Sequence, residues 1–281
     1  MVVTSFRNPR VKFFRSLQVR KYREREGLYL IEGIRFVEEA LDRGAPIEAL
    51  IYAPDLLVSD RARALVERIA PEQRLVLSAD VFGSLSEREQ PQGIAAAVRI
   101  VDPPLETLPL VQDLLVVVAY QLRDPGNLGS IIRTADAAGA TGVIVVEPAA
   151  DLYDPQTVRA TMGSLFALPI VRILDEAPLS TWYRHVRAAG LDLLVAGTSA
   201  RGDRLYYEVD YRRPLVLLLG SEREGLGEEA RRTADVLVRL PMSGSATSLN
   251  VSAAAAALIY QVVRQRAVAP DLTPAGGRSG S

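Results

Sequence analysis

The sequence predicts an α/β protein of two parts, a small N-terminal domain and a larger C-terminal domain built on a mostly parallel sheet. Two observations support this fold class. Short Val- and Leu-rich runs bounded by turn residues alternate with helical stretches, as expected for strands buried under helices. The segment 102–110, with Pro103, Pro104 and Pro109, interrupts this alternation and is typical of a linker between residues 1–101 and the second domain.

Composition limits the chemistry that the chain can perform. Its 281 residues, 48% hydrophobic and 24% charged, can bury a full core. The longest apolar runs are too short to cross a bilayer and no signal peptide is recognisable, so a cytoplasmic protein that does not enter a membrane is expected. Cys is absent and His185 is the single His, which excludes disulfides, thiolate nucleophiles and His or Cys metal sites. His185 lies far from every motif and is interpreted as structural.

The N-terminal domain is expected to begin with a strongly basic helix. As far as Glu26 the chain carries eight Lys or Arg residues against two Glu, although the net charge of the whole chain is only −1. Such a patch can bind phosphates by releasing their counterions, whereas a solvated helix face is the alternative. The elements predicted next are strands over 28–31, 49–52, 74–77 and 93–101, and helices over 34–43 and 60–69.

The C-terminal domain is predicted from six apolar runs that have the length of buried strands. They cover residues 114–120, 142–146, 169–173, 191–196, 215–219 and 236–240. An open parallel sheet binds ligands at the carboxyl ends of its strands. Neither a G-x-x-x-x-G-K-[ST] loop nor a G-x-G-x-x-G turn follows the first of these strands, which argues against a kinase or dinucleotide site. The Pro-, Gly- and Ser-rich segment 269–281 is predicted to be disordered.

Three polar, glycine-bearing segments lie beside these strands. In the first, 124–135, Pro125 and Gly126 predict a turn, Asn127 is expected to cap the following helix, and Arg133 lies almost two turns further on. An N-cap followed by an arginine is by itself commonplace, so this segment alone supports only a structural interpretation.

The second and third segments follow later strands. In 220–227, Gly220 allows a ligand to approach the backbone and Glu222 places a carboxylate at the strand end, although these glycines could equally form an ordinary turn. In 240–252, small hydroxyl and amide side chains supply donors for a polar ligand. An alanine-rich helix predicted over 253–260 follows, against which the sheet or another subunit can pack closely.

In order and spacing, the three segments resemble the signature motifs of the SpoU (TrmH-like) family of RNA ribose 2′-O-methyltransferases. One such motif alone would be weak support, whereas three in one order are specific. The matching residues are Asn127, Gly129, Arg133 and Thr134; Gly220, Glu222, Gly225 and Leu226; and Pro241, Met242, Ser248, Leu249, Asn250 and Ser252. Residues 160–166 are similar to a further segment of the family, and residues 8–12 and 30–33 resemble the substrate-binding domain of its ribosomal RNA branch.

The resemblance implies features that periodicity could not reveal. The C-terminal domain, over 111–268, would be a SPOUT methyltransferase domain with a deep trefoil knot, preceded by a small α/β domain like ribosomal protein L30e. Since knots are rare, the pattern alone would predict an ordinary doubly wound sheet. The resemblance also implies a homodimer and S-adenosylmethionine as cofactor.

The resemblance assigns roles to individual residues. The cofactor would contact Thr198, Gly220, Leu240, Met242 and Leu249. The residues on the reaction side would be Asn127, Arg133, Glu222, Ser248 and Asn250. RNA would be bound by basic residues of the first segment, namely Arg7, Arg10, Lys12, Arg20, Lys21 and Arg23.

The reaction implied is methylation of a ribose 2′-hydroxyl, with 23S ribosomal RNA as the expected substrate. A transfer-RNA ribose methyltransferase and a non-catalytic RNA-binding relative are the alternatives. The family's mechanism makes the arginine of the first motif a base, yet a guanidinium stays protonated and is a poor acceptor. We therefore expect Arg133 to hold a phosphate and stabilise the developing alkoxide, with Glu222 orienting Arg133 or Asn127.

Overall fold

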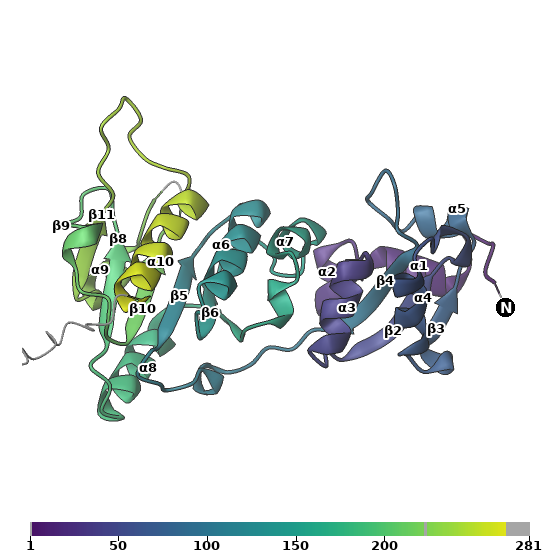
Figure 1. Ribbon diagram of the computed structural model, residues 1–281, viewed down its shortest axis with the longest axis horizontal. Coiled ribbons are helices and arrows are strands. Elements are labelled where there is room, and N and C mark those ends of the chain that lie inside the picture. Colours follow the sequence, from purple (N-terminus) through teal and green to yellow (C-terminus); the bar gives the residue numbers. More distant parts are fainter. Residues whose placement is uncertain (1, 222–223, 268–281) are drawn as a thin grey trace, which may run out of the picture.

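The structure, a computed structural model, describes residues 2–221 and 224–267 and consists of two sheets with their covering helices (Figure 1). The two parts lie side by side along the long axis of the molecule. Glu222 and the segment 269–281, for which disorder was predicted, lie outside the described residues. Among the helices of the described part, none is long and apolar enough to span a membrane.

The N-terminal sheet has four strands in the order β1-β4-β2-β3. Strand β4 is antiparallel to β1 and β2, and β2 is parallel to β3. All four predicted strands and both predicted helices are present, while the expected basic helix is divided into two. The elements are α1 (Pro9–Ser16), α2 (Arg20–Glu26), β1 (Leu28–Glu32), α3 (Ile34–Asp42), β2 (Ile47–Tyr52), α4 (Asp60–Glu67), β3 (Arg74–Val76), α5 (Ala79–Gly83) and β4 (Ile94–Arg99).

The C-terminal sheet has seven strands in the order β7-β6-β5-β10-β8-β11-β9, and every pairing in it is parallel. The prediction of a mostly parallel α/β sheet is therefore confirmed; the knot stays a prediction. Strand β9 has only two residues, too few to give a pattern. The strands are β5 (Leu115–Tyr120), β6 (Gly142–Val146), β7 (Ile170–Ile173), β8 (Leu194–Thr198), β9 (Arg204–Leu205), β10 (Leu215–Leu219) and β11 (Val236–Arg239).

Helices cover both faces of this sheet because successive side chains of its strands point to opposite sides. In β5, Val117 packs in one buried cluster with residues of α6 and α10, whereas Val116 and Val118 pack in another with residues of α8 and α9. The helices are α6 (Pro125–Ala137), α7 (Pro155–Thr161), α8 (Ala177–Ala188), α9 (Glu228–Thr233) and α10 (Val251–Ala267). Short 3-10 helices occur at Pro54–Leu56, Pro71–Gln73, Leu105–Thr107, Ser164–Phe166 and Tyr206–Glu208. His185 is exposed on α8.

Helix α6 begins differently from the prediction. Asp124 is its N-cap, with a side-chain oxygen that accepts the N–H of Asn127 at 2.7 Å, and Pro125 is the first helical residue. Proline suits that position because its missing N–H would have had no helical partner. The prediction that Asn127 caps the helix is therefore wrong. Asn127 lies inside the first turn of the helix.

Helices α6 and α7 pack against each other at Gly129, the glycine of the first motif. A Cβ atom at this position would lie 2.5 Å from the Ala160 Cβ atom and 2.5 Å from the carbonyl oxygen of Thr157. No larger residue fits without moving one helix. The glycine therefore sets how closely α7 approaches the helix that carries Asn127 and Arg133.

Arg266 holds the C-terminal end of α10 at the end of the sheet where β5 and β10 begin. Its guanidinium donates to four carbonyl oxygens at 2.5 to 3.2 Å, those of Asp113, Leu114, Tyr211 and Arg213. Burial lowers the pKa of this guanidinium. Since these carbonyls lie next to the first residues of β5 and β10, Arg266 holds the last helix across the centre of the sheet.

The two parts of the molecule share one hydrophobic cluster. Tyr29 and Ile31 of β1 belong to the same buried cluster as two residues of the second part. These are Tyr153, which precedes α7, and Val158, which lies in α7. The rings of Tyr29 and Tyr153 are 4.5 Å apart between centroids. The segment between β4 and β5 therefore connects two parts of the molecule that pack against each other through β1 and the region of α7.

We expect Gly129→Ala to lower the free energy of unfolding by about 1–3 kcal/mol, because the added methyl group overpacks the contact between α6 and α7. Urea denaturation measures the change. Gly83→Ala is the matched control, since a Cβ atom there meets nothing within 4 Å. It should leave stability within about 1 kcal/mol of the parent, and equal losses in both variants would contradict the packing argument.

Candidate active site

A groove opens at the carboxyl ends of three adjacent strands, β10, β8 and β11. It encloses about 1390 Å³ including its open mouth. All five residues predicted to contact a cofactor line it, together with Ser248 of the predicted reaction side. These residues are Thr198, Gly220, Leu240, Met242 and Leu249. The groove lies where an open parallel sheet is expected to bind its ligand.

The wall after β10 is a tight turn that leaves main-chain groups facing the groove. Ser221 and Gly225 exchange two backbone hydrogen bonds, at 2.9 and 3.1 Å, and Gly225 has a φ of +69°. A Cβ atom on Gly220 would lie 2.2 Å from the Gly225 carbonyl carbon. The glycines of the second motif are therefore required by the turn. Glu222, predicted to act on the reaction side, lies outside the described residues.

The wall after β8 was not recognised in the sequence. Residues 199–201 line the groove, and the backbone N–H of Ser199 donates to the Val238 carbonyl oxygen at 2.9 Å. The Gly202 carbonyl accepts from Arg239 at 2.5 Å, which closes the loop against β11. Arg201 is exposed beside the groove and adds a positive charge. The sequence marks the loop 199–201 only by its position, directly after a strand that ends at the site.

The third wall is the long loop between β11 and α10, which stands away from the body of the molecule in Figure 1. Every residue from 241 to 250 is exposed. Two large apolar side chains on it are only partly covered, Met242 at 38% exposure and Leu249 at 47%. Uncovered apolar groups beside main-chain donors and acceptors suit a ligand that has both a flat apolar part and a polar part.

The first and third motifs contact each other although they are far apart in sequence. The Nδ2 group of Asn250 donates to the Oδ1 atom of Asn127 at 3.0 Å. The Oδ1 atom of Asn250 accepts from the backbone N–H groups of Ser252 and Ala253, at 2.8 and 3.3 Å, where α10 begins. Asn250 therefore caps α10 and joins it to the start of α6.

Arg133 lies on α6 outside the groove of its own chain. It follows Asn127 by six residues, which places the two side chains about 120° apart around the helix. The side chain is exposed, and within the described ranges it forms no hydrogen bond or ion pair. The structure therefore groups Asn127, Asn250 and Ser248 near the groove and leaves Arg133 pointing to solvent.

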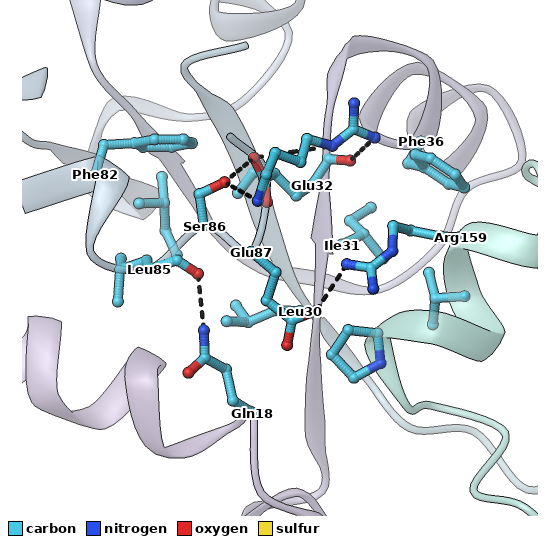
Figure 2. Close-up of a pocket in the computed structure, with 15 residues that line it drawn as sticks. Gln18, Leu30, Ile31, Glu32, Phe36, Phe82, Leu85, Ser86, Glu87 and Arg159 are labelled. Carbon is cyan, nitrogen blue, oxygen red and sulfur yellow. Dashed lines mark hydrogen bonds and ion pairs between the residues drawn. The ribbon is translucent and has the colours of Figure 1, made fainter. Parts of the chain in front are cut away.

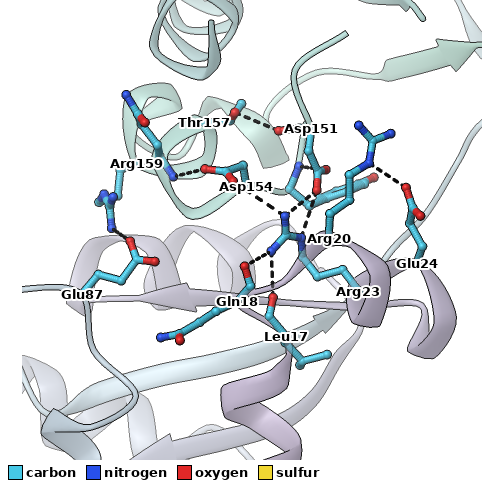
Figure 3. Close-up of polar contacts among 12 residues, drawn as sticks. Leu17, Gln18, Arg20, Arg23, Glu24, Glu87, Asp151, Asp154, Thr157 and Arg159 are labelled. Carbon is cyan, nitrogen blue, oxygen red and sulfur yellow. Dashed lines mark hydrogen bonds and ion pairs between the residues drawn. The ribbon is translucent and has the colours of Figure 1, made fainter. Parts of the chain in front are cut away.

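The basic residues of the N-terminal segment divide into two groups. Arg7, Arg10, Lys12 and Lys21 are exposed, and none of them forms an ion pair with another described residue. Arg20 pairs with Glu24 at 2.7 Å and lies 3.7 Å from Glu147. Arg23, expected to bind RNA, is only 2% exposed and pairs with Asp151 at 2.5 Å (Figure 3). A buried guanidinium is not available to a phosphate, so that expectation is corrected.

Two family models match the chain. The model described as the SpoU rRNA Methylase family covers residues 114–260. The model described as the MRM3-like substrate binding domain covers residues 8–96. The first includes the groove and all three motifs, and the second includes the exposed basic residues except Arg7.

Two relatives and one solved structure match most of the chain. A 23S rRNA (uridine(2479)-2′-O)-methyltransferase of Streptomyces viridochromogenes is 40% identical over 88% of this chain and 86% of its own. The 23S rRNA (guanosine(2553)-2′-O)-methyltransferase RlmP of Bacillus subtilis is 34% identical over 92% and 98%. The SpoU methyltransferase AviRb of Streptomyces viridochromogenes, in complex with the cofactor AdoMet, has a TM-score of 0.88, 37% identity, and coverage of 93% and 99%.

We expect the two functions of Asn250 to separate in two variants. Asn250→Ala removes the cap and the contact with Asn127, and should lower the free energy of unfolding by about 1–2 kcal/mol. Asn250→Asp keeps the oxygen that caps α10 and should retain most of that stability. Urea denaturation compares them with Asn8→Ala, which removes the cap of α1. Equal losses for Asn250→Asp and Asn250→Ala would show that the cap contributes little.

Proposed function

The chain belongs to the SpoU rRNA methylase family, and we propose that it transfers the methyl group of S-adenosylmethionine to a ribose 2′-hydroxyl of 23S ribosomal RNA. The observation that carries this proposal is the convergence of three separate motifs on one groove. Thr198, Gly220 and Leu249 come from three different loops and line the same cavity. Both relatives described above are named as methyltransferases of 23S rRNA ribose groups.

The groove has the composition that S-adenosylmethionine requires. The exposed side chains of Met242 and Leu249 offer an apolar surface for the adenine ring, and the turn at Gly220 offers main-chain groups for its polar edge. The bound cofactor supplies an activated methyl group on a sulfonium centre. The protein has to place a ribose oxygen in line with that methyl group and to stabilise the charge that develops.

We propose that Arg133 stabilises the charge that develops on the ribose oxygen, with support from Asn127 and Asn250. The guanidinium of Arg133 is exposed and is therefore ready to hold an RNA phosphate and to donate to the developing alkoxide. It is a poor proton acceptor, so the proton of the hydroxyl group leaves to another acceptor or to water. Ser248 and Glu222 complete the proposed reaction side, as the family motifs imply.

We further propose that the protein acts as a homodimer and contains the trefoil knot of its family. The uncovered surface near the site supports the dimer: residues 241–250 are exposed, and Tyr260 on α10 is 51% exposed. A second chain would cover these groups and could bring Arg133 to the groove. The proposed domain division is 1–101 for RNA binding and 111–268 for methyl transfer.

Two alternatives remain distinguishable by experiment, a transfer-RNA methyltransferase and a non-catalytic RNA-binding relative. The match to a substrate-binding domain over residues 8–96 favours ribosomal RNA over transfer RNA. The presence of Asn127, Arg133 and Asn250 at their motif positions favours an active enzyme.

The direct test is transfer of radiolabelled methyl groups from S-adenosylmethionine to 23S rRNA, with bulk transfer RNA as the competing substrate. Reverse transcription at low nucleotide concentration then locates the modified ribose by its stops. Labelling of 23S rRNA at one position is the expected result. Labelling of transfer RNA alone would indicate the first alternative, and labelling of neither would indicate the second.

We expect Arg133→Ala to lower kcat on 23S rRNA by about 10²–10³-fold, because one donor to the developing charge is lost. Binding of S-adenosylmethionine, measured by isothermal titration calorimetry, should change by less than about twofold, a small fraction of a kcal/mol. Arg184→Ala is the control, since Arg184 is an exposed arginine of α8. A matching loss of cofactor binding in Arg133→Ala would contradict this role.

The exposed basic residues generate a separate prediction. Changing Arg10, Lys12 and Lys21 together to Ala should weaken RNA binding and flatten the plot of log affinity against log salt by about 0.7–0.9 per lost phosphate contact. Filter binding over a range of KCl concentrations measures the slope.

The matched control changes three exposed arginines of the same part of the chain that already pair with carboxylates. They are Arg61, Arg63 and Arg68. This triple Ala variant removes the same charge and should leave the slope close to the parent's. Equal slopes for both triple variants would show that net charge alone determines binding.

A further inference from the structure

Arg23 is a buried cation at the contact between the two parts of the molecule (Figure 3). It belongs to the basic helix α2, yet its side chain is 2% exposed. Its Nε and Nη2 groups donate to one carboxylate oxygen of Asp151, at 3.1 and 2.5 Å, and Nη2 lies 3.7 Å from Asp154. Both acidic residues belong to the C-terminal part, in the loop that leads into α7.

The remaining donors of Arg23 bind the N-terminal part. Its Nη1 group donates to the carbonyl oxygens of Leu17 and Gln18, at 2.9 and 2.8 Å, which lie between α1 and α2. One guanidinium therefore fixes the turn between two helices of the first part and a carboxylate of the second. A lysine could not do the same, because an ammonium group lacks the planar fork of donors.

The acidic loop bound by Arg23 also holds the start of α7. Asp154 caps this helix by accepting the Gln156 N–H at 2.9 Å. The Asp151 carbonyl oxygen accepts the hydroxyl of Thr157, a fully buried residue of α7, at 2.8 Å. Helix α7 in turn packs on Gly129 of α6 at a distance that allows no side chain. A continuous series of close contacts therefore runs from α2 to the helix that carries Asn127 and Arg133.

A second ion pair between the two parts is a weaker constraint. Arg159 of α7 pairs with Glu87 at 2.7 Å, but both side chains are about two-fifths exposed, and exposed pairs contribute little. Beside this pair, a mainly apolar cavity separates Leu30, Ile31 and Phe36 from Pro155 and Val158 of the second part (Figure 2). The two parts are incompletely packed around this cavity. The buried hydrogen bonds of Arg23 therefore constrain their relative orientation more than the contacts beside the cavity do.

We propose that Arg23 is a positioning residue for methyl transfer: it holds the RNA-binding part at one orientation relative to α6, so that bound RNA presents one ribose to the groove. This inference rests on the proposed function. Its consequence is that losing Arg23 uncouples binding from reaction. RNA would still bind to the exposed cations, and the cofactor would still enter its groove, but the target ribose would no longer be held in register.

The orientation can be measured independently of activity. Because the chain has no Cys, spin labels at Glu72→Cys and Ala137→Cys report one distance between the two parts. Both positions are exposed, and they lie on opposite sides of the contact. Labelled chains are diluted with unlabelled chains so that only distances within one chain are recorded. Pulsed electron paramagnetic resonance should give a narrow distribution for the parent and a broader one for Arg23→Lys and Asp151→Asn.

The catalytic consequence is measured on two RNAs, a long 23S rRNA fragment and a short hairpin that carries the modified nucleotide. For Arg23→Lys and Asp151→Asn, kcat/KM on the long fragment should fall on the order of 10- to 100-fold, the loss expected from misplacement by about an ångström. On the hairpin, which does not span both parts of the molecule, kcat/KM of the variants should stay within about twofold of the parent value. Labelling of neighbouring riboses should appear on the long fragment.

The matched control is Arg25→Ala, which removes a positive charge from the same helix. Arg25 is exposed, pairs with the adjacent Glu26, and lies 4.9 Å from the centroid of the Tyr22 ring in the same helix. Arg25→Ala should leave the distance distribution narrow and keep kcat/KM on both RNAs within about twofold of the parent. If Arg23→Lys and Asp151→Asn fail to fold, Asp154→Asn removes the negative charge that lies 3.7 Å from Arg23, and the same assays on this variant test the proposal.

An unchanged distance distribution in folded Arg23 or Asp151 variants would overturn the proposal, as would an equal loss on the long fragment and the hairpin. A parent protein that methylates neither RNA would overturn the proposed function and, with it, the catalytic role of Arg23. In that case the distance distribution would still decide whether Arg23 fixes the orientation of the two parts.

Discussion

The groove depends on one geometric constraint, the meeting of three parallel strand ends at a single edge of the sheet. The loops that leave β8 and β10 side by side have little room, and each contains a glycine where a Cβ atom would collide with backbone. At Gly220 such an atom would lie 2.2 Å from Gly225, and at Gly202 it would lie 2.6 Å from Val238. Gly220 of the second motif and Gly202 of the loop after β8 are therefore required for a steric reason. Main-chain groups, rather than side chains, then form much of the surface offered to a ligand.

A second constraint connects this edge to the rest of the molecule. Asn250 joins the start of α10 to Asn127 in α6. Arg266 holds the C-terminal end of α10 next to the start of β5. Helix α6 is itself fixed against α7 at Gly129. Because each helix is held at more than one point, a displacement of one is transmitted to the others. Residues far from the groove can in this way determine where the reactive groups lie.

Much of this could be predicted from the sequence, and the exceptions have physical causes. Apart from β9, the strands of both sheets were recognisable because buried strands are rich in apolar residues. The residues of the groove were recognisable where their motifs follow those strands. The N-cap of α6 was misassigned because Asp124 and Asn127 are both good caps, and only the position of Pro125 separates them. Arg23 was misassigned because charge along a sequence does not show which guanidinium a neighbouring domain buries. The loop at 199–201 has no distinctive residue pattern, and only its position marks it.

The surroundings of Arg133 bear on how the reaction can proceed. A guanidinium stays protonated in nearly all proteins, so it donates hydrogen bonds and is a poor proton acceptor. Arg133 is on an exposed face of α6, where an RNA phosphate can reach its guanidinium. A base at this position would have to be created by burial against another chain or against RNA. Phosphate groups of an RNA would instead stabilise the cation, so the substrate itself opposes deprotonation. The donor role proposed for Arg133 uses the charge that RNA phosphates would preserve, and it therefore agrees with the electrostatics that bring the substrate to the site.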